Sequence, residues 1–245
     1  MAKHRNNSLG TVLITGSSKR IGQAIALSLA EWGYNIALHF NESLDAAEDL
    51  AAIIRKKKGI CETFAADLSD RDDALSLIET VQKRFPDLNV LINNASIFKP
   101  SKLTTADLSR LDEHWAVNFK APYILICEFA RVCQKGKIIN ILDTHIVQNK
   151  TAHMAYLLSK KSLADLTKLA AVSLAPHIRV NGIAPGIILP PNQQSYNYLL
   201  QLANKIPLQK RGDVAHITRS VRFLLENDYL TGQILFNDGG EHLTQ

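Results

Sequence analysis

Tyr156 and Lys160 are the two residues in this sequence whose types and spacing point most directly to chemistry. They are four positions apart in a helical pattern, so their side chains lie on one helix face, one turn apart. An ammonium group beside a phenol favours the phenolate and lowers the tyrosine pKa, so the phenol can transfer a proton near neutral pH. The same spacing is also common on exposed helices as an ordinary contact. A catalytic interpretation therefore depends on the elements around the pair.

A glycine turn near the N-terminus is the second feature that indicates chemistry. The apolar run Thr11–Thr15 leads into Gly16, and a helical pattern that begins at Ile21 carries Gly22 in its first turn. Glycines let the backbone turn tightly and approach a pyrophosphate, whose charge the amides at a helix N-terminus can bind. Glycine also marks ordinary tight connections, so the turn predicts a dinucleotide site only together with other motifs.

The end of the second apolar run bears on which nicotinamide cofactor is used. Enzymes that choose NAD usually have an acidic residue at this point, whereas this chain has His39. Lys19, Arg20, His39 and Ser43 could contact a 2′-phosphate, and we therefore predict NADPH. Glu42 argues for NADH, and the alternative is that these positions only turn the chain after the strand.

Polar residues also follow the third and fourth apolar runs. Asp67 and Leu68 follow the third, where the carboxylate could bond an adenine amino group or cap the helix that starts near Asp70. Asn94 and Ser96 follow the fourth, at the carboxyl edge of the predicted sheet, where such folds bind ligands. In isolation the asparagines could form an ordinary turn.

The pattern of apolar residues predicts an α/β fold. Seven short runs rich in branched residues are typical of buried parallel strands, and helical patterns lie between them. The predicted strands are Thr11–Thr15, Asn35–Phe40, Cys61–Ala65, Val90–Ile92, Lys137–Leu142, Arg179–Ile183 and Gln233–Phe236. The predicted helices include Ile21–Trp32, Leu44–Lys57, Asp72–Arg84, Leu108–Phe119, Met154–Leu174 and Val214–Leu225. This alternation predicts a doubly wound parallel sheet of Rossmann type.

Composition limits the class of protein. The 245 residues, 46% of them hydrophobic, can build one domain over 1–245, with 1–10 as an N-terminal extension and 187–210 as a substrate loop. No apolar run or signal region predicts a membrane span or export, so we expect a cytoplasmic protein. The three cysteines lack metal-ligand spacing. The net charge of +5 is scattered apart from Arg55–Lys58 at a helix end, so we expect no nucleic-acid partner.

Taken together, the motifs resemble the short-chain dehydrogenase/reductase family over nearly the whole chain. In chain order they are Thr15-Gly16 through Gly22, Asp67, Asn93-Asn94-Ala95, Asn118, Tyr156 with Lys160, Val180–Gly186, Leu230-Thr231-Gly232-Gln233 and Asp238-Gly239-Gly240. The resemblance implies that Tyr156 donates the proton, that Lys160 lowers its pKa and binds the ribose, and that Asn118 anchors a relay water. It also implies a homo-oligomer, expected to be a tetramer, and Met154–Leu174 is too apolar for one buried face.

One position departs from most of that family. Thirteen residues before Tyr156, where most members have a serine, this chain has Asp143. The aspartate is similar to that of the pteridine reductases, as are Lys19-Arg20, Asn94–Phe98 and Asn118–Pro122, while Gly240–Leu243 looks more like dihydromonapterin reductases. A pterin presents amide and amino nitrogens that suit a carboxylate and a guanidinium, and Phe98 is placed to cover its flat ring.

The sequence therefore predicts an oxidoreductase that transfers a hydride from NADPH to a dihydropterin, giving the tetrahydropterin. The substrate could be dihydrobiopterin, dihydromonapterin or dihydrofolate; the alternatives are a ketone or ketoacyl reductase and a non-catalytic dinucleotide-binding sensor. The predicted catalytic residues are Asp143, Tyr156, Lys160 and Asn118; the cofactor residues are Gly16, Lys19, Arg20, Ile21, Gly22, His39, Ser43, Asp67, Leu68, Asn94, Ala95, Ser96, Lys160, Pro185 and Gly186; the substrate residues are Arg20, Ser96, Phe98, Asp143 and Tyr156.

Overall fold

Short runs of branched residues form the strands of one parallel sheet. In the computed structural model, which describes residues 8–105, 107–190 and 196–244, seven strands pair in the order β3-β2-β1-β4-β5-β6-β7. The strands are β1 (Thr11–Ile14), β2 (Asn35–Phe40), β3 (Cys61–Ala65), β4 (Leu88–Asn93), β5 (Gly136–Ile141), β6 (Ile178–Pro185) and β7 (Ile234–Asn237). All adjacent pairs are parallel, and the prediction of a Rossmann-type doubly wound sheet is confirmed.

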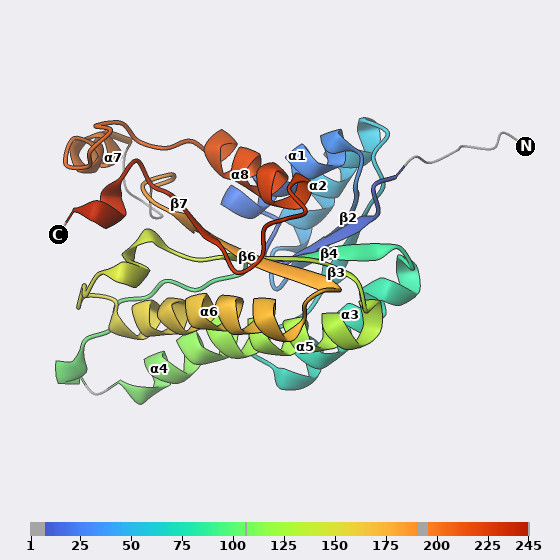
Figure 1. Cartoon of the computed structure of the whole chain (residues 1–245), viewed down its shortest axis with the longest axis horizontal. Helices are drawn as coiled ribbons and strands as arrows, with labels where there is room; N and C mark the ends of the chain where they lie inside the picture. Colours follow the sequence, from blue (N-terminus) through green and yellow to red (C-terminus); the bar gives the residue numbers. More distant parts are fainter. Residues whose placement is uncertain (1–7, 106, 191–195, 245) are drawn as a thin grey trace, which may run out of the picture.

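Helices cover both faces of the sheet (Figure 1). The helices α1 (Arg20–Trp32), α2 (Leu44–Lys56) and α8 (Val214–Glu226) lie on one face. The helices α3 (Arg71–Arg84), α5 (Ala121–Cys133) and α6 (Met154–Ser173) lie on the other, where α4 (Leu108–Trp115) packs against α6. Such a three-layer arrangement leaves the strand ends, rather than the sheet faces, to form a site.

The alternation of side chains along each strand builds two separate cores. Val12 and Ile14 of β1 pack in the core under α1, α2 and α8, whereas Leu13 between them packs in the core under α3, α5 and α6. Both faces are buried because successive side chains of a strand point to opposite sides. This explains why the strands are apolar throughout rather than at every second position.

The predicted helix Leu108–Phe119 is interrupted. The α-helical turn of α4 gives way to a π-helical segment, Ala116–Lys120, which continues directly into α5. The helix α5 is not among the predicted helices. A π-helical turn inside a longer helix is rare and is found mostly at functional sites, and this one contains Asn118.

The order of the strands reverses between β1 and β4, which are neighbours in the sheet but distant in sequence. The connections leave these two strands towards opposite faces, so a crevice opens at their carboxyl ends. Near the same edge, Asp70 rather than Asp67 caps α3, because its side chain accepts from the amides of Asp72 and Asp73. Asp67 instead accepts from the backbone and hydroxyl of Ser69, in the turn beyond β3.

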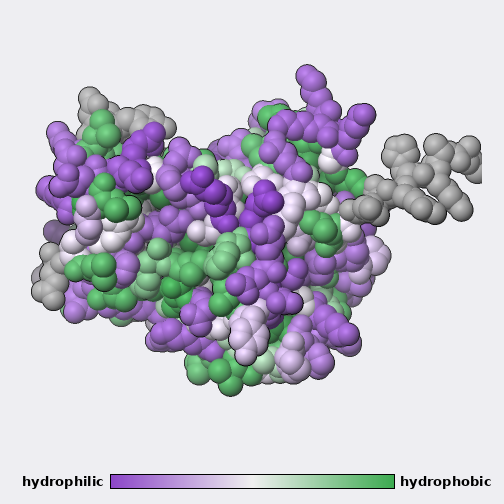
Figure 2. All heavy atoms as spheres, turned by 45° about the horizontal axis from the view of Figure 1, so that its top comes forward, coloured by the Kyte–Doolittle hydropathy of each residue, from purple (hydrophilic) through white to green (hydrophobic). Residues whose placement is uncertain are grey.

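Two segments predicted from sequence lie partly outside the described residues: 1–7 of the N-terminal extension and 191–195 of the substrate loop. The described remainder of that loop includes α7 (Tyr196–Ala203). Among the described residues, no helix is both long enough and apolar enough to cross a membrane. Hydrophilic and hydrophobic side chains alternate in patches over the face seen in Figure 2.

Candidate active site

The predicted site residues meet in one cleft at the carboxyl ends of the strands. The cleft has a volume of about 610 Å³, within the range of small-molecule and cofactor sites. Every residue predicted to bind cofactor or substrate lines it, as do Asp143, Tyr156 and Lys160; Asn118 alone among the predicted residues does not. The sheet thus brings together side chains that are up to 170 positions apart in the sequence.

The glycine turn is built so that no side chain can occupy its inner surface. Gly16 has a φ of +59°, and a Cβ there would lie 2.9 Å from the backbone of Ala95. A Cβ on Gly22 would lie 2.6 Å from both the Gly16 carbonyl and the Asn94 amide. The Asn94 side chain holds the turn by donating to the carbonyls of Thr15 and Gly16, each at 2.9 Å. The turn therefore exposes backbone towards the cleft, as a pyrophosphate site requires.

His39 is buried at the end of β2, next to the glycine turn. Its ring is 2% exposed; Nδ1 accepts from the Gly16 amide at 3.0 Å, and Nε2 faces the Ala66 carbonyl at 3.1 Å. Burial lowers its pKa to about 4, so the ring is neutral near pH 7. Because β2 is an internal strand, His39 lines the cleft with one ring nitrogen bonded to the glycine turn and the other facing Ala66. Its predicted contact with a 2′-phosphate stays a prediction.

Lys19, Ser43 and Arg20 remain at the rim of the cleft. The Lys19 ammonium donates to the Ser43 hydroxyl at 3.0 Å, so these two residues form one polar wall beside Glu42. Arg20 has a φ of +58°, which is uncommon for a residue with a side chain, and its guanidinium donates to the Pro190 carbonyl at 3.0 Å. The arginine thus links the glycine turn to the beginning of the predicted substrate loop.

Tyr156 and Asp143 form the central pair of the site. The Tyr156 hydroxyl donates to Oδ2 of Asp143 at 2.8 Å, and the ring is 9% exposed. Burial, and then the charge and hydrogen bond of Asp143, raise the pKa of Tyr156 well above its ordinary value. The phenol is therefore protonated near neutral pH and is a proton donor.

Lys160 lies beside the ring of Tyr156. Its Nζ is 5.9 Å from the centre of the Tyr156 ring and donates to the Ile141 carbonyl at 2.8 Å. Burial lowers the pKa of Lys160 itself to about 8, with Asp143 opposing that effect. The pKa of Tyr156 is raised rather than lowered because its ring is buried and because Asp143, in place of a neutral serine, puts a negative charge in direct contact with the phenol.

Asn118 supports the site from within the protein. It is fully buried, accepts from the Ile97 amide at 2.9 Å, and donates to the Ile97 carbonyl at 3.0 Å and to Ser159 at 3.2 Å. These bonds fix the segment that carries Ser96 and Phe98 against the helix that carries Tyr156. The structure thus shows Asn118 positioning the cleft wall; its predicted part in a relay water stays a prediction.

Phe98 stands at the open side of the pair. Its ring packs edge-on against Tyr156 with 4.7 Å between centroids, and it remains 52% exposed. His153 stacks on it with 4.1 Å between centroids and 14° between the planes. An exposed aromatic ring beside a buried acid and a proton donor can accept a flat heterocycle.

A family model described as enoyl-(acyl carrier protein) reductase matches residues 16–242, which include every predicted site residue. The chain belongs to the short-chain dehydrogenase/reductase family. The seven-stranded sheet, the glycine turn and the Tyr156–Lys160 pair are therefore those of a short-chain oxidoreductase.

Relatives within this family differ in what they act on. A solved structure of FolM alternative dihydrofolate reductase 1 from Brucella suis, in complex with NADP, is 36% identical, covers 97% of this chain and 96% of its own, and has a TM-score of 0.92. Pteridine reductase 1 from Leishmania tarentolae is 29% identical over 95% of this chain and 96% of its own length. The 3-oxoacyl-[acyl-carrier-protein] reductase FabG of Staphylococcus epidermidis is 33% identical over 95% and 99%.

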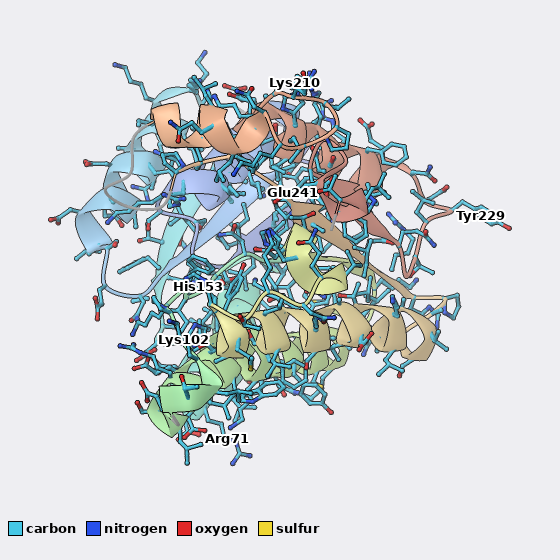
Figure 3. The ribbon with its side chains drawn as sticks, turned by 90° about the vertical axis from the view of Figure 1, so that its left-hand side faces the viewer. Arg71, Lys102, His153, Lys210, Tyr229 and Glu241 are labelled. Atoms are coloured by element: carbon cyan, nitrogen blue, oxygen red, sulfur yellow. The ribbon has the colours of Figure 1, made fainter. Side chains whose placement is uncertain are left out.

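Two residues of the site were not predicted from the sequence. His145 lies two positions after Asp143 and contacts it, and Glu241 contacts His145 from near the other end of the chain. Figure 3 places Glu241 over the middle of the molecule, whereas Tyr229 of the same C-terminal region points away from it. The sequence signal near Glu241 is the motif Gly240–Leu243, which indicates a resemblance but no contact.

Proposed function

We propose that this short-chain oxidoreductase transfers a hydride from NADPH to a dihydropterin and produces the tetrahydropterin. The observation that supports this proposal most is the Asp143–Tyr156 pair beside the open ring of Phe98. A carboxylate can accept from the amide and amino nitrogens of a pterin, which a ketone does not have. Two relatives, FolM alternative dihydrofolate reductase 1 and pteridine reductase 1, are named for the reduction of dihydrofolate and of pteridines.

The residues along the cleft fit the cofactor. The glycine turn offers backbone without side chains, and Lys19 with Ser43 offers a cation and a hydroxyl where a 2′-phosphate would bind. NADP is the cofactor in the solved Brucella relatives. When bound, the reduced nicotinamide supplies the hydride.

The chain's own residues would supply and place the proton. The hydride and its electron pair add to the carbon of a pterin C=N bond, and the adjacent nitrogen takes a proton from the Tyr156 hydroxyl, directly or through water. Asp143 would accept from the pterin's N–H groups, and Phe98 would hold the ring by stacking. The phenolate left on Tyr156 would be stabilised by Lys160 in its ammonium form, and it recovers its proton from solvent.

A second candidate is reduction of a 3-oxoacyl group, as the name of the Staphylococcus relative indicates. The specific observation in its favour is 33% identity over 95% of this chain, comparable with the identity to FolM. The Asp143 carboxylate argues against it, because a developing alkoxide beside a carboxylate is destabilised by like charge.

The deciding experiment follows oxidation of NADPH and of NADH with dihydrobiopterin, dihydromonapterin, dihydrofolate and a panel of ketones and 3-oxoacyl thioesters. The proposal expects turnover of at least one dihydropterin and little turnover of the panel. In Asp143→Ser, dihydropterin turnover should fall while ketone turnover should not. Reduction of ketones and 3-oxoacyl thioesters alone by the wild type would replace the proposal with the second candidate.

We also propose that the chain acts as one domain in a homo-oligomer, expected to be a tetramer. Large apolar side chains stay exposed on α6, where Leu158, Leu169 and Val172 are 45%, 69% and 82% exposed. Such a row on one helix is the kind of surface that a second copy covers. Light scattering at micromolar concentration tests this, and a monomer would refute it.

Ile188 and Leu189 line the cleft, so we further propose that 187–210 shapes the substrate pocket.

A further inference from the structure

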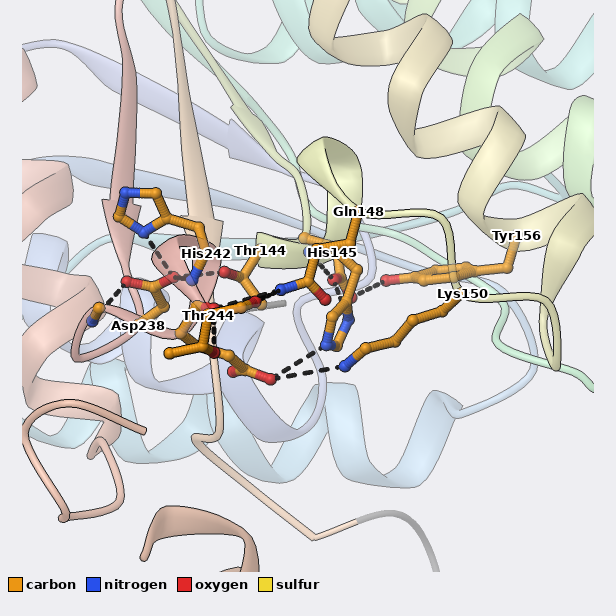
Figure 4. A network of polar contacts seen from close by, with 11 residues as sticks. Thr144, His145, Gln148, Lys150, Tyr156, Asp238, His242 and Thr244 are labelled. Carbon is orange, nitrogen blue, oxygen red and sulfur yellow. Dashed lines mark hydrogen bonds and ion pairs between the residues drawn. The ribbon is translucent and has the colours of Figure 1, made fainter. Parts of the chain in front are cut away.

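A chain of charged groups leads away from the catalytic pair towards the C-terminal segment (Figure 4). Asp143 uses Oδ2 for the Tyr156 hydroxyl and Oδ1 for His145, whose Nδ1 is 2.7 Å away and whose backbone amide donates at 2.8 Å. The other ring nitrogen of His145 lies 3.0 Å from Oε1 of Glu241. A continuous series of polar contacts thus runs from Tyr156 through Asp143 and His145 to Glu241.

The geometry at His145 fixes its protonation. A neutral imidazole has one N–H donor and one acceptor nitrogen, whereas here both nitrogens face carboxylate oxygens that only accept. Two favourable hydrogen bonds at these positions require a proton on each nitrogen. His145 is therefore an imidazolium held between two carboxylates.

Glu241 needs a cation at this position. Its side chain is 11% exposed, and Oε2 is one of the buried side-chain oxygens without a hydrogen-bond partner among the described residues. Burying an ionised carboxylate is costly unless a cation is close. His145 and Lys150, whose Nζ is 3.8 Å from Oε1, supply that charge.

The C-terminal segment around Glu241 is tied to the segment that follows β5. Asp238 accepts from the hydroxyl of Thr144 and from the backbone and ring of His242. Gln148 donates to the backbone carbonyls of Glu241, at 3.2 Å, and Thr244, at 2.8 Å. Glu241 is therefore held in place from both sides, so its carboxylate can set the orientation of the His145 ring.

We propose that His145 and Glu241 are positioning residues of the active site: the His145 imidazolium, oriented by Glu241, keeps Asp143 ionised with Oδ2 turned towards Tyr156. This inference rests on the proposed function only for the role given to Asp143. Asp143 is the group that touches Tyr156, and His145 and Glu241 act through it. The segment Gly240–Leu243 thereby contributes to the catalytic pair from the far end of the sequence.

The pKa shifts of His145 and Asp143 agree with this arrangement. Burial lowers the pKa of His145, but the hydrogen bonds and charges of Asp143 and Glu241 outweigh it and raise the pKa to about 9. For Asp143, burial raises the pKa, and the contacts with His145 and Tyr156 outweigh it and lower the pKa. His145 lies in a 3-10 turn, Thr144–Val147, and Glu241 in another, Glu241–Leu243. The titratable groups that face His145 are Asp143 before its turn, Lys150 after it, His153 just before α6, and Glu241.

The first test measures the protonation of His145 directly and needs no substrate. Protein carrying ¹³C at histidine Cε1 is titrated by NMR between about pH 6 and pH 10, and the His145 signal is identified by its loss in His145→Gln. The proposal expects His145 to titrate near its raised value, about 9. In Glu241→Gln it should titrate lower by about one pH unit, because one of two carboxylates is gone. Titration near the ordinary histidine value in the wild type would overturn the proposal.

The second test measures kcat between about pH 5 and pH 7 with whichever substrate the wild type reduces. Without the imidazolium, the effect of burial on Asp143 is no longer outweighed and its pKa rises, so the ratio of kcat in His145→Gln to kcat in wild type should fall towards pH 5. His145→Lys keeps a cation and should restore most of this ratio. His177→Gln makes the same substitution at an exposed position just before β6, outside the series of contacts from Tyr156 to Glu241, and its ratio should stay constant with pH. A ratio for His145→Gln that does not change with pH would overturn the proposal.

The two tests separate this inference from the proposed function. If ketones rather than dihydropterins are reduced, the proposed function fails, while the titration of His145 still decides the inference. If dihydropterins are reduced and His145 is neutral at pH 7, the inference alone fails.

Discussion

The Tyr156 hydroxyl donates its proton to Oδ2 of Asp143 across 2.8 Å, so the proton donor of the site is already hydrogen-bonded before substrate arrives. A substrate nitrogen must compete with the carboxylate for this proton. The carboxylate in turn must find another donor, which the N–H groups of a pterin can provide. An exchange of partners of this kind selects for a substrate that has both an acceptor and a donor close together.

Tyr156→Phe should lower kcat by about a hundredfold or more, because it removes the acid while leaving the ring in place. The Kd for NADPH, measured by fluorescence titration, should change little. Tyr229→Phe is the matched control, since Tyr229 is 95% exposed and far from the cleft. Full activity in Tyr156→Phe would mean that another group donates the proton.

Asp143→Asn should lower the pKa of Tyr156, because it removes the negative charge that acts with burial to raise it. In an alkaline titration followed by phenolate absorbance, one tyrosine should then ionise at lower pH than in the wild type. Dihydropterin turnover should fall by about tenfold or more, and the Kd for NADPH should stay near the wild-type value. Asp165→Asn, whose side chain is 76% exposed, serves as the control. Unchanged titration and unchanged turnover would remove Asp143 from the site.

Phe98→Ala should weaken substrate binding more than it slows the chemical step. Stacking on a flat ring contributes about 1 kcal/mol, and it does so equally before and during hydride transfer. The expected result is therefore a KM for the dihydropterin raised by about five- to tenfold with kcat within about twofold of wild type. A kcat that falls while KM is unchanged would show that Phe98 aligns the transition state and does not bind the ring.

The fold could be predicted because the strands are buried on both faces, which leaves a nearly continuous apolar run for each. Some errors in bounds are at polar ends such as Asn93 and Asn237, which the ladder of hydrogen bonds includes although their side chains are not apolar. Others are at apolar residues such as Leu88 and Ile178. The Tyr156–Lys160 pair could be predicted because its spacing is local.

Other parts of the site could not be predicted, because they depend on distant contacts. His145 and Glu241 are 96 positions apart and lie in short turns that have no periodicity. The surroundings of His39 could not be predicted for a related reason. Its place at a strand end suggested a contact with a 2′-phosphate or a simple turn, whereas pairing of β2 with both β1 and β3 buries it.

Lys19→Ala should reduce the preference for NADPH over NADH. The ammonium of Lys19, beside the Ser43 hydroxyl, is the cation that would bind the 2′-phosphate, and a charge-assisted bond of this kind contributes about 1.5–3 kcal/mol. The ratio of kcat/KM for NADPH to that for NADH should therefore fall by about tenfold or more. Lys83→Ala, on the exposed side of α3, should leave the ratio unchanged. Equal or better use of NADH by the wild type would point to Glu42 as the residue that sets the preference.

Acidification should destabilise the fold through His39. Its pKa is lowered to about 4 in the folded protein by burial, whereas in the unfolded chain it has the ordinary value of 6.5. Between these values the unfolded chain binds a proton that the folded protein does not, so the free energy of unfolding falls as pH decreases from 6.5 towards 4. The full decrease in the free energy of unfolding from this group is about 3 kcal/mol.

Urea denaturation of wild type and His39→Gln at several pH values should show a smaller decrease in the free energy of unfolding on acidification in the variant. The variant should be less stable than wild type at pH 7, because the bond to Gly16 is altered. His177→Gln, at an exposed position, should keep the wild-type pH dependence. Equal pH dependence in all three proteins would show that His39 is not buried in its neutral form.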